Sequence, residues 1–205
     1  MSQPFDRSAC IPAPKRPDDR LKDWWVENPF AIAANGKSLS GYERNRIYLN
    51  SRGQTFFEIS GLTSADSEGD ARGVVASDFT GDGLPDLLVR QAGGGTLLYF
   101  ENQFPKASWL RVSLEGRKSN RQGIGARLTA EVGGQKIVRE LYPANGFMSQ
   151  NPAHVHFGLG KAARLDRLTI AWPSGVRQEF TNLEINRAIR IAEDSAQVHA
   201  ALTAP

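Results

Sequence analysis

Apolar and polar residues alternate with a period of two along three stretches in the second half of the chain. The apolar members are Leu110, Val112 and Leu114, then Ala126, Leu128, Ala130 and Val132, then Leu168, Ile170 and Trp172. Such alternation gives a strand one buried and one solvated face, as in antiparallel sheets. Turn residues at Gly133-Gly134, Asn145-Gly146 and Pro173-Ser174-Gly175 punctuate this part of the chain. We therefore expect an immunoglobulin-like antiparallel β-sandwich over residues 105–194.

The first half of the chain divides into an arm and a second β region. Four prolines within residues 1–20 favour an extended arm. Leu21, Trp24 and Trp25 predict a short helix within residues 19–34, so residues 1–41 are expected to form an arm and a short helix. Runs of β-forming residues at 47–49, 55–59 and 96–100 predict a mainly β region over residues 42–104. The alanine-rich residues 195–205 are expected to be a frayed tail.

Composition excludes few classes of protein. The formal net charge of +3 is small for 205 residues, so nucleic acid is not an expected partner. Cys10 is the only cysteine and cannot form an internal disulfide. No apolar run approaches the roughly 20 residues of a membrane helix, and residues 1–19 lack the apolar core of a signal peptide. As it stands, the chain is expected to be cytoplasmic.

The most specific chemical feature is an aspartate-rich loop over residues 78–86, which we call the aspartate loop. Its alternate positions offer oxygen ligands from Asp78, Thr80, Asp82, the carbonyl of Leu84, and Asp86. Calcium is a hard cation that takes six to eight oxygens, many from carboxylates. Gly81 and Gly83 permit the tight backbone path that such a site needs. The sequence therefore predicts a calcium site; the alternative is a solvated turn, since Asp and Gly are turn formers.

The flanks of the aspartate loop decide what kind of site it could be. A helix-loop-helix calcium site needs a glutamate at position 12, where this chain has Val89. Pro85 and the apolar residues 87–89 exclude an exiting helix. We therefore expect a strand-loop-strand arrangement.

Two sets of motifs resemble known families. The aspartate loop and residues 45–50 upstream (NRIYLN) resemble FG-GAP repeats of integrin-type propellers. Residues 119–127 (SNRQGIGAR), 156–160 (HFGLG) and 172–175 (WPSG) resemble the ASPIC/UnbV domain of the cartilage acidic protein family. The resemblance implies calcium binding by the aspartate loop, a role in adhesion or interaction, a β-sandwich after residue 108, and secretion if a leader precedes the chain.

The chain departs from the family pattern in the number of repeats. Family members usually carry many FG-GAP repeats, whereas residues 42–104 have room for roughly one and a half. A closed propeller needs at least four blades. Open sheet edges must then be covered by the arm, the sandwich or a second chain, and a homodimer through these edges is one expectation.

A second candidate binding site surrounds the glycine-rich residues 116–125, which we call the basic loop. Its cations, with the residue that follows it, are Arg117, Lys118, Arg121 and Arg127. Guanidinium groups and backbone amides there could hold the sulfate, phosphate or carboxylate of an acidic glycan. The alternative is a solvated hairpin.

Other titratable residues give weaker hypotheses. His154 and His156 lie two apart in an expected strand and could bind zinc with a carboxylate, or could be one buried and one exposed histidine. Ser149 and Ser174 lack the motif that exposes a hydrolase nucleophile. Asp66, Glu68 and Asp70 could act as an acid–base pair or form an exposed acidic loop.

The leading functional hypothesis is a non-enzymatic, calcium-binding interaction or adhesion module that recognises a protein or an acidic glycan. The alternative is an enzyme or accessory protein of a natural-product pathway, which rests on association with the UnbV half of the family name.

Overall fold

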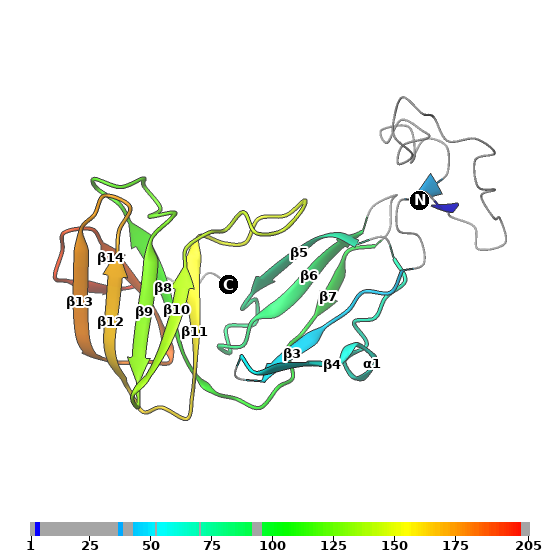
Figure 1. Ribbon diagram of the computed structural model, residues 1–205, viewed down its shortest axis with the longest axis horizontal. Helices are drawn as coiled ribbons and strands as arrows, with labels where there is room; N and C mark the ends of the chain where they lie inside the picture. The colour runs from blue at the N-terminus through cyan, green and yellow to red at the C-terminus, as the bar shows by residue number, and fades with distance from the viewer. Residues whose placement is uncertain are drawn as a thin grey trace. The chain divides into compact units, whose positions relative to one another are not determined.

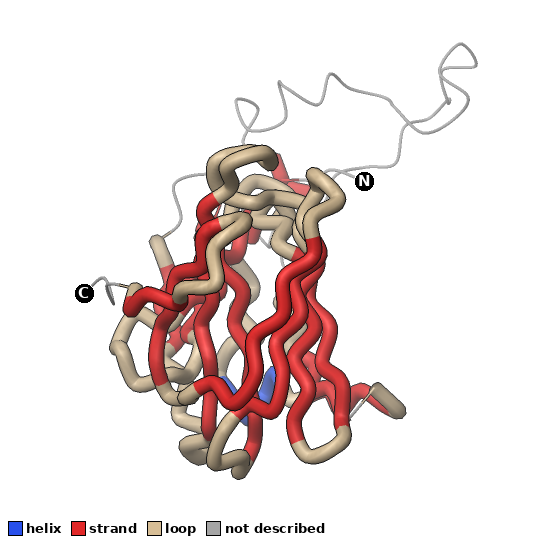
Figure 2. The backbone as a smooth tube through the Cα atoms, turned by 90° about the vertical axis from the view of Figure 1, so that its left-hand side faces the viewer, coloured by secondary structure: helices blue, strands red, loops and turns tan. Residues whose placement is uncertain are grey.

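The computed structural model describes residues 3–4, 37–38, 43–51, 53–69, 71–91 and 96–201. Strands and loops make up nearly all of it, with one short helix (blue in Figure 2). The mainly β, antiparallel prediction is confirmed. The expected helix over residues 19–34 lies outside the described residues. No helix in the described part is long and apolar enough to cross a membrane.

The chain divides into two compact units, residues 1–73 with 89–98 and residues 74–88 with 99–205. The first unit contains the two-residue strands β1 (Gln3–Pro4) and β2 (Lys37–Ser38), which pair with each other. It also contains the hairpin of β3 (Tyr48–Ser51) and β4 (Thr55–Glu58), followed by α1 (Ser60–Thr63). In the hairpin turn, Gly53 adopts a φ of 75° and donates its amide to the Asn50 side chain.

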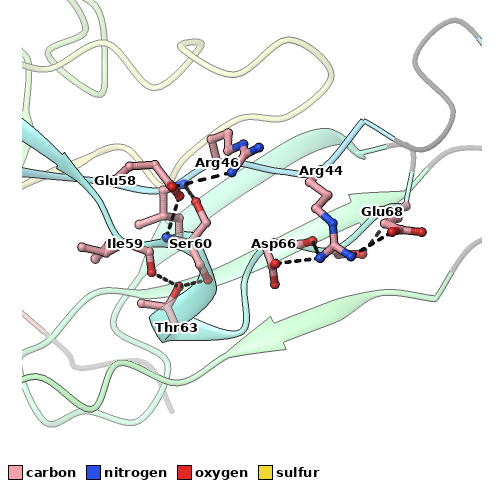
Figure 3. Close-up of polar contacts among 11 residues, drawn as sticks. Arg44, Arg46, Glu58, Ile59, Ser60, Thr63, Asp66 and Glu68 are labelled. Carbon is pink, nitrogen blue, oxygen red and sulfur yellow. Dashed lines mark hydrogen bonds and ion pairs between the residues drawn. The ribbon is translucent and has the colours of Figure 1, made fainter.

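Side chains brace the first unit around α1 (Figure 3). The buried Ser60 hydroxyl accepts the Ile47 amide at 2.7 Å, and the Glu58 carboxylate accepts the Ser60 amide at 2.9 Å. Arg44 binds Asp66 at 2.7 Å and Glu68 at 2.9 Å. Asp66 and Glu68 are therefore ion-pair partners of one arginine, an arrangement that does not favour an acid–base role.

A three-stranded sheet of order β5-β6-β7 carries the aspartate loop. Its strands are β5 (Ala71–Ser77), β6 (Asp86–Gln91) and β7 (Leu98–Phe100). The aspartate loop connects β5 to β6, so the expected strand-loop-strand arrangement is present.

Two four-stranded sheets make up most of the second unit (Figure 1). One has the order β10-β9-β12-β13 and the other β11-β8-β14-β15. Their bounds are β8 (Ser108–Glu115), β9 (Arg127–Val132), β10 (Gln135–Glu140), β11 (His154–Gly160), β12 (Leu165–Ala171), β13 (Arg177–Leu183), β14 (Arg187–Ala192) and β15 (Val198–Ala200). All pairs are antiparallel except β8 with β14, which is parallel.

One hydrophobic core draws on both sheets. Its fully buried side chains include Leu110 and Ile189 from one sheet and Leu128, Leu168 and Ile170 from the other. The period-two pattern assigns Leu110, Leu128, Leu168 and Ile170 to the buried face, whereas Ile189 on β14 lies outside the predicted stretches. The two sheets thus share a core, and the immunoglobulin-like assignment stays a prediction.

Candidate functional sites

Asp78 holds the aspartate loop closed through backbone amides. Its Oδ1 accepts the amides of Gly81 at 2.7 Å and Asp82 at 3.1 Å, and its Oδ2 accepts that of Gly83 at 3.0 Å. Asp78 is buried, and a buried polar group is costly unless it has such hydrogen-bond partners. The loop therefore folds around its first aspartate.

Asp86 anchors the other end of the loop. It is fully buried, with Oδ2 accepting the Phe79 amide at 3.0 Å and Oδ1 accepting the Asn102 amide at 2.8 Å. The Asn102 side chain returns a bond to the carbonyl of Pro85 at 2.9 Å. Asp82 instead lies exposed and accepts a local bond from the Leu84 amide at 2.9 Å.

Two glycines in the loop have different reasons to be there. Gly81 and Gly83 have φ values of 78° and 89°, which L side chains rarely adopt. Space around Gly81 is open, whereas a Cβ at Gly83 would lie 1.9 Å from Nε1 of Trp109. Gly83 is therefore required both by its backbone conformation and by its contact with the indole.

The oxygen atoms of the aspartate loop are the type of ligand that calcium takes. Asp78, Asp82 and Asp86 supply carboxylates, Thr80 an exposed hydroxyl, and Leu84 a carbonyl. A carboxylate oxygen has lone pairs for more than one partner, so the amide bonds leave acceptor capacity on Asp78 and Asp86. Within the described residues, no three His, Cys, Asp or Glu side chains converge to hold a metal. The donor chemistry fits calcium, and the amide bonds already keep the loop closed.

Glu193 fills the anion-binding position of the basic loop. It is fully buried, and its Oε2 accepts the amides of Arg117, Lys118 and Ser119, each at 2.7 Å. Its Oε1 accepts the hydroxyl of Ser119 at 3.0 Å and that of Ser174. Burial raises the pKa of Glu193, but the amide and hydroxyl bonds outweigh it and lower the pKa to about 2.

The glutamate changes the interpretation of the basic loop. Three amides that could have held an external anion are occupied by the chain's own carboxylate. The Lys118 ammonium pairs with Asp194 at 2.9 Å, and hydrogen bonding to Asp194 raises the Lys118 pKa. Arg117, Arg121 and Arg127 are exposed, so any anion binding here would rely on their side chains.

Sequence reasoning missed Glu193, although a signal was present. Glu193 follows Ile189 and Ile191 at the same parity, and both isoleucines point into the core. An acid in the next inward position must find hydrogen-bond donors. The identity of those donors depends on the basic loop, some 75 residues earlier.

His154 and His156 lie on one face of β11 and are both partly buried. His156 stacks on Trp109 with ring centroids 5.9 Å apart. Burial, with the charge of Arg111, lowers the His154 pKa to about 4, and burial also lowers the His156 pKa. They are therefore neutral near pH 7, and the zinc hypothesis gains no third ligand from the described residues.

The two serines considered as nucleophiles have structural partners. The Ser149 hydroxyl donates to the carbonyl of Val74 at 2.8 Å and accepts the Val74 amide at 3.1 Å. Asn151 accepts the neighbouring Ala76 amide at 2.9 Å. Ser149 and Asn151 thus occupy backbone groups of β5, and Ser174 bonds to Glu193.

Comparison with known families gives two matches. Residues 116–198 match the family described as ASPIC and UnbV, and residues 31–89 match the FG-GAP-like repeat. Both resemblances drawn from the sequence motifs are confirmed. No curated protein matches the chain. FG-GAP-like repeats are generally protein-interaction modules.

Proposed function

Because this chain joins an FG-GAP-like repeat to an ASPIC and UnbV domain, we propose that it is a non-enzymatic interaction module whose aspartate loop binds calcium. The observation that carries the proposal is the loop itself. Its ends are fixed by Asp78 and Asp86, while Thr80 and Asp82 remain exposed. A loop whose backbone is already closed by amide bonds to Asp78 and Asp86 reduces the ordering that a bound cation must impose.

In this proposal, Asp78, Asp82 and Asp86 supply charge to the cation, and Thr80 and the Leu84 carbonyl supply neutral oxygens. Bound calcium would have to draw together carboxylates that do not converge without it, and it would link the end of β5 to the start of β6. The existing amide bonds keep the loop closed in either state, so calcium acts mainly on stability and on the exposed face of the loop.

Exposed apolar side chains on the β3–β4 hairpin support a role in association. Tyr48, Leu49, Phe56 and Phe57 are 44–61% exposed. The register places Leu49 and Phe57 on one face of the hairpin and Tyr48 and Phe56 on the other, and exposed apolar side chains of this size are typical of faces that a partner covers. The partner is a protein or an acidic glycan, and a second copy joined through open sheet edges is one form of the protein case.

Thermal unfolding in chelator and in calcium tests the metal part of this proposal. Extracellular-type calcium modules bind with a Kd of about 10⁻⁴ to 10⁻³ M. At about 2 mM calcium and a Kd near 10⁻⁴ M, binding adds about 1.8 kcal/mol to the free energy of unfolding. For a chain of this size, the melting temperature should rise by about 4–7 °C.

Two matched variants sharpen this test. Asp82→Asn removes an exposed ligand charge from the loop, and the rise should shrink to below about 2 °C. Asp166→Asn makes the same change on β12, away from the loop, and should keep the full rise. A melting temperature that ignores calcium in the parent protein would contradict calcium binding by the loop.

A further inference from the structure

The solvent-facing side of the sheet β10-β9-β12-β13 differs in charge from one end to the other. At one end, the register places Lys136, Glu131 and Arg167 side by side. Glu131 pairs with Lys136 at 3.2 Å and with Arg167 at 3.8 Å, and Arg167 also pairs with Glu179 at 3.6 Å. The charges at this end neutralise one another.

At the other end of the same face, the register places Arg127, Ala171 and Arg177 side by side. With two strand spacings between them, the Cα atoms of the two arginines are about 10 Å apart. Both side chains are exposed, and neither forms an ion pair or side-chain hydrogen bond within the described part of the chain. Glu140, beside Arg127 on β10, forms no ion pair with it there either.

Ala171 leaves open space between the two arginines. It is exposed and lies between the two arginines. Because its side chain is a single methyl group, both guanidinium groups can converge on a ligand above it. Guanidinium groups bind sulfate and carboxylate through paired, charge-assisted hydrogen bonds.

The basic loop extends this cationic end. The Ser174 amide donates to the Ser119 hydroxyl at 3.2 Å, which brings the turn between β12 and β13 beside the basic loop. The same loop leads into β9 at Arg127 and carries the exposed Arg121. A long anion lying across Arg127 and Arg177 could therefore also contact the loop.

We propose that Arg127 and Arg177, on either side of Ala171, form the centre of a surface that binds an acidic glycan through its sulfate or carboxylate groups. This inference rests on the proposed interaction function and names the partner class. Thr129 lies in the next row of the face, where its hydroxyl could form a hydrogen bond to a sugar hydroxyl of the glycan. The rows that carry Arg127 and Thr129 contain no aromatic residue, so they lack both the anchors of a protein hot spot and a platform for stacked bases.

Binding of the full chain to immobilised heparin and hyaluronan tests the inference. The double variant Arg127→Gln with Arg177→Gln should bind about tenfold more weakly than the parent. The control, Lys136→Gln with Arg167→Gln, removes the same charge from the neutralised end of the face and should change affinity less than about twofold. Binding to heparin alone identifies sulfate as the recognised group, and binding to both glycans shows that carboxylate suffices.

Three results would overturn the inference. They are absence of glycan binding by the parent, equal losses in the two double variants, and stronger binding of poly-glutamate or a DNA oligonucleotide than of either glycan. The calcium-dependent rise in melting temperature, measured on the same variants, reports separately on the aspartate loop. Loss of glycan binding with a retained calcium effect distinguishes failure at one site from failure at the other.

Discussion

A single residue, Glu193, fixes the conformation of the basic loop. An ionised carboxylate that accepts three backbone amides fixes the conformation of the segment that donates them. Here that segment begins the basic loop, and the hydroxyls of Ser119 and Ser174 attach the β12–β13 turn to the same carboxylate. One buried acid therefore fixes two loops at the cationic end of the sheet.

We expect Glu193→Gln to lower the melting temperature at pH 7 by about 10 °C, because an amide offers one acceptor oxygen where the carboxylate offers two. The control Glu184→Gln, in an exposed pair with Arg187, should change it by no more than about 2 °C. Differential scanning calorimetry measures both. Equal, small effects would show that the amides do not need the carboxylate.

The pH dependence of stability, compared between the parent protein and Glu193→Gln, tests whether the Glu193 carboxylate stabilises the fold. The folded-state pKa of Glu193 is about 2, below its ordinary value of 4.5. Its stabilisation is therefore complete above about pH 4.5 and is lost as the pH falls toward 2. Glu193→Gln should flatten this part of the stability curve, and an unchanged acid limb would contradict the assignment.

At the scale of an element, the aspartate loop depends on glycine for two separable reasons. Gly81→Ala should cost about 1 kcal/mol in the free energy of unfolding, because it strains only the backbone. Gly83→Ala should cost about 3 kcal/mol, because its Cβ also collides with Trp109. Urea denaturation monitored by tryptophan fluorescence measures both costs. Equal costs would show that the Gly83–Trp109 contact does not restrain the loop.

The sequence predicts strands well and their partners poorly. Alternation assigns Leu128, Leu168 and Ile170 to the buried face, and the structure confirms it. Alternation does not say which strands pair or in what register. The cluster of Arg127, Ala171 and Arg177 follows from the register of three strands, so local pattern points to Arg127, in the basic loop's flank, but not to Arg177.

In the candidate sites too, residues close in sequence are predictable and their long-range partners are not. Spacing within one loop predicts the oxygen donors of residues 78–86, because they are neighbours in sequence. Their amide partners, including Asn102, depend on how the chain returns to the loop. The basic loop was recognised from its cations, whereas its bond to Glu193 required the parallel pairing of β14 with β8.

At the scale of the whole molecule, segments far apart in sequence build each unit. The second unit combines residues 74–88 with 99–205, so the aspartate loop and the β8–β15 sheets belong to one unit although the loop lies within the FG-GAP-like match. Parallel pairing of β8 with β14 then joins the first strand of the two four-stranded sheets to one of the last. Neither feature follows from local pattern, because both are long-range contacts.

Calcium binding by the aspartate loop is the central claim, and isothermal titration calorimetry on the full chain tests it most directly. After dialysis against chelator-treated buffer, the parent protein should bind one calcium ion with a Kd of about 10⁻⁴ to 10⁻³ M. Asp82→Asn should weaken binding about tenfold or more, while Asp166→Asn should leave it unchanged. A parent protein that binds no calcium at millimolar concentration, or an Asp82→Asn variant that binds as tightly as the parent, would contradict the account.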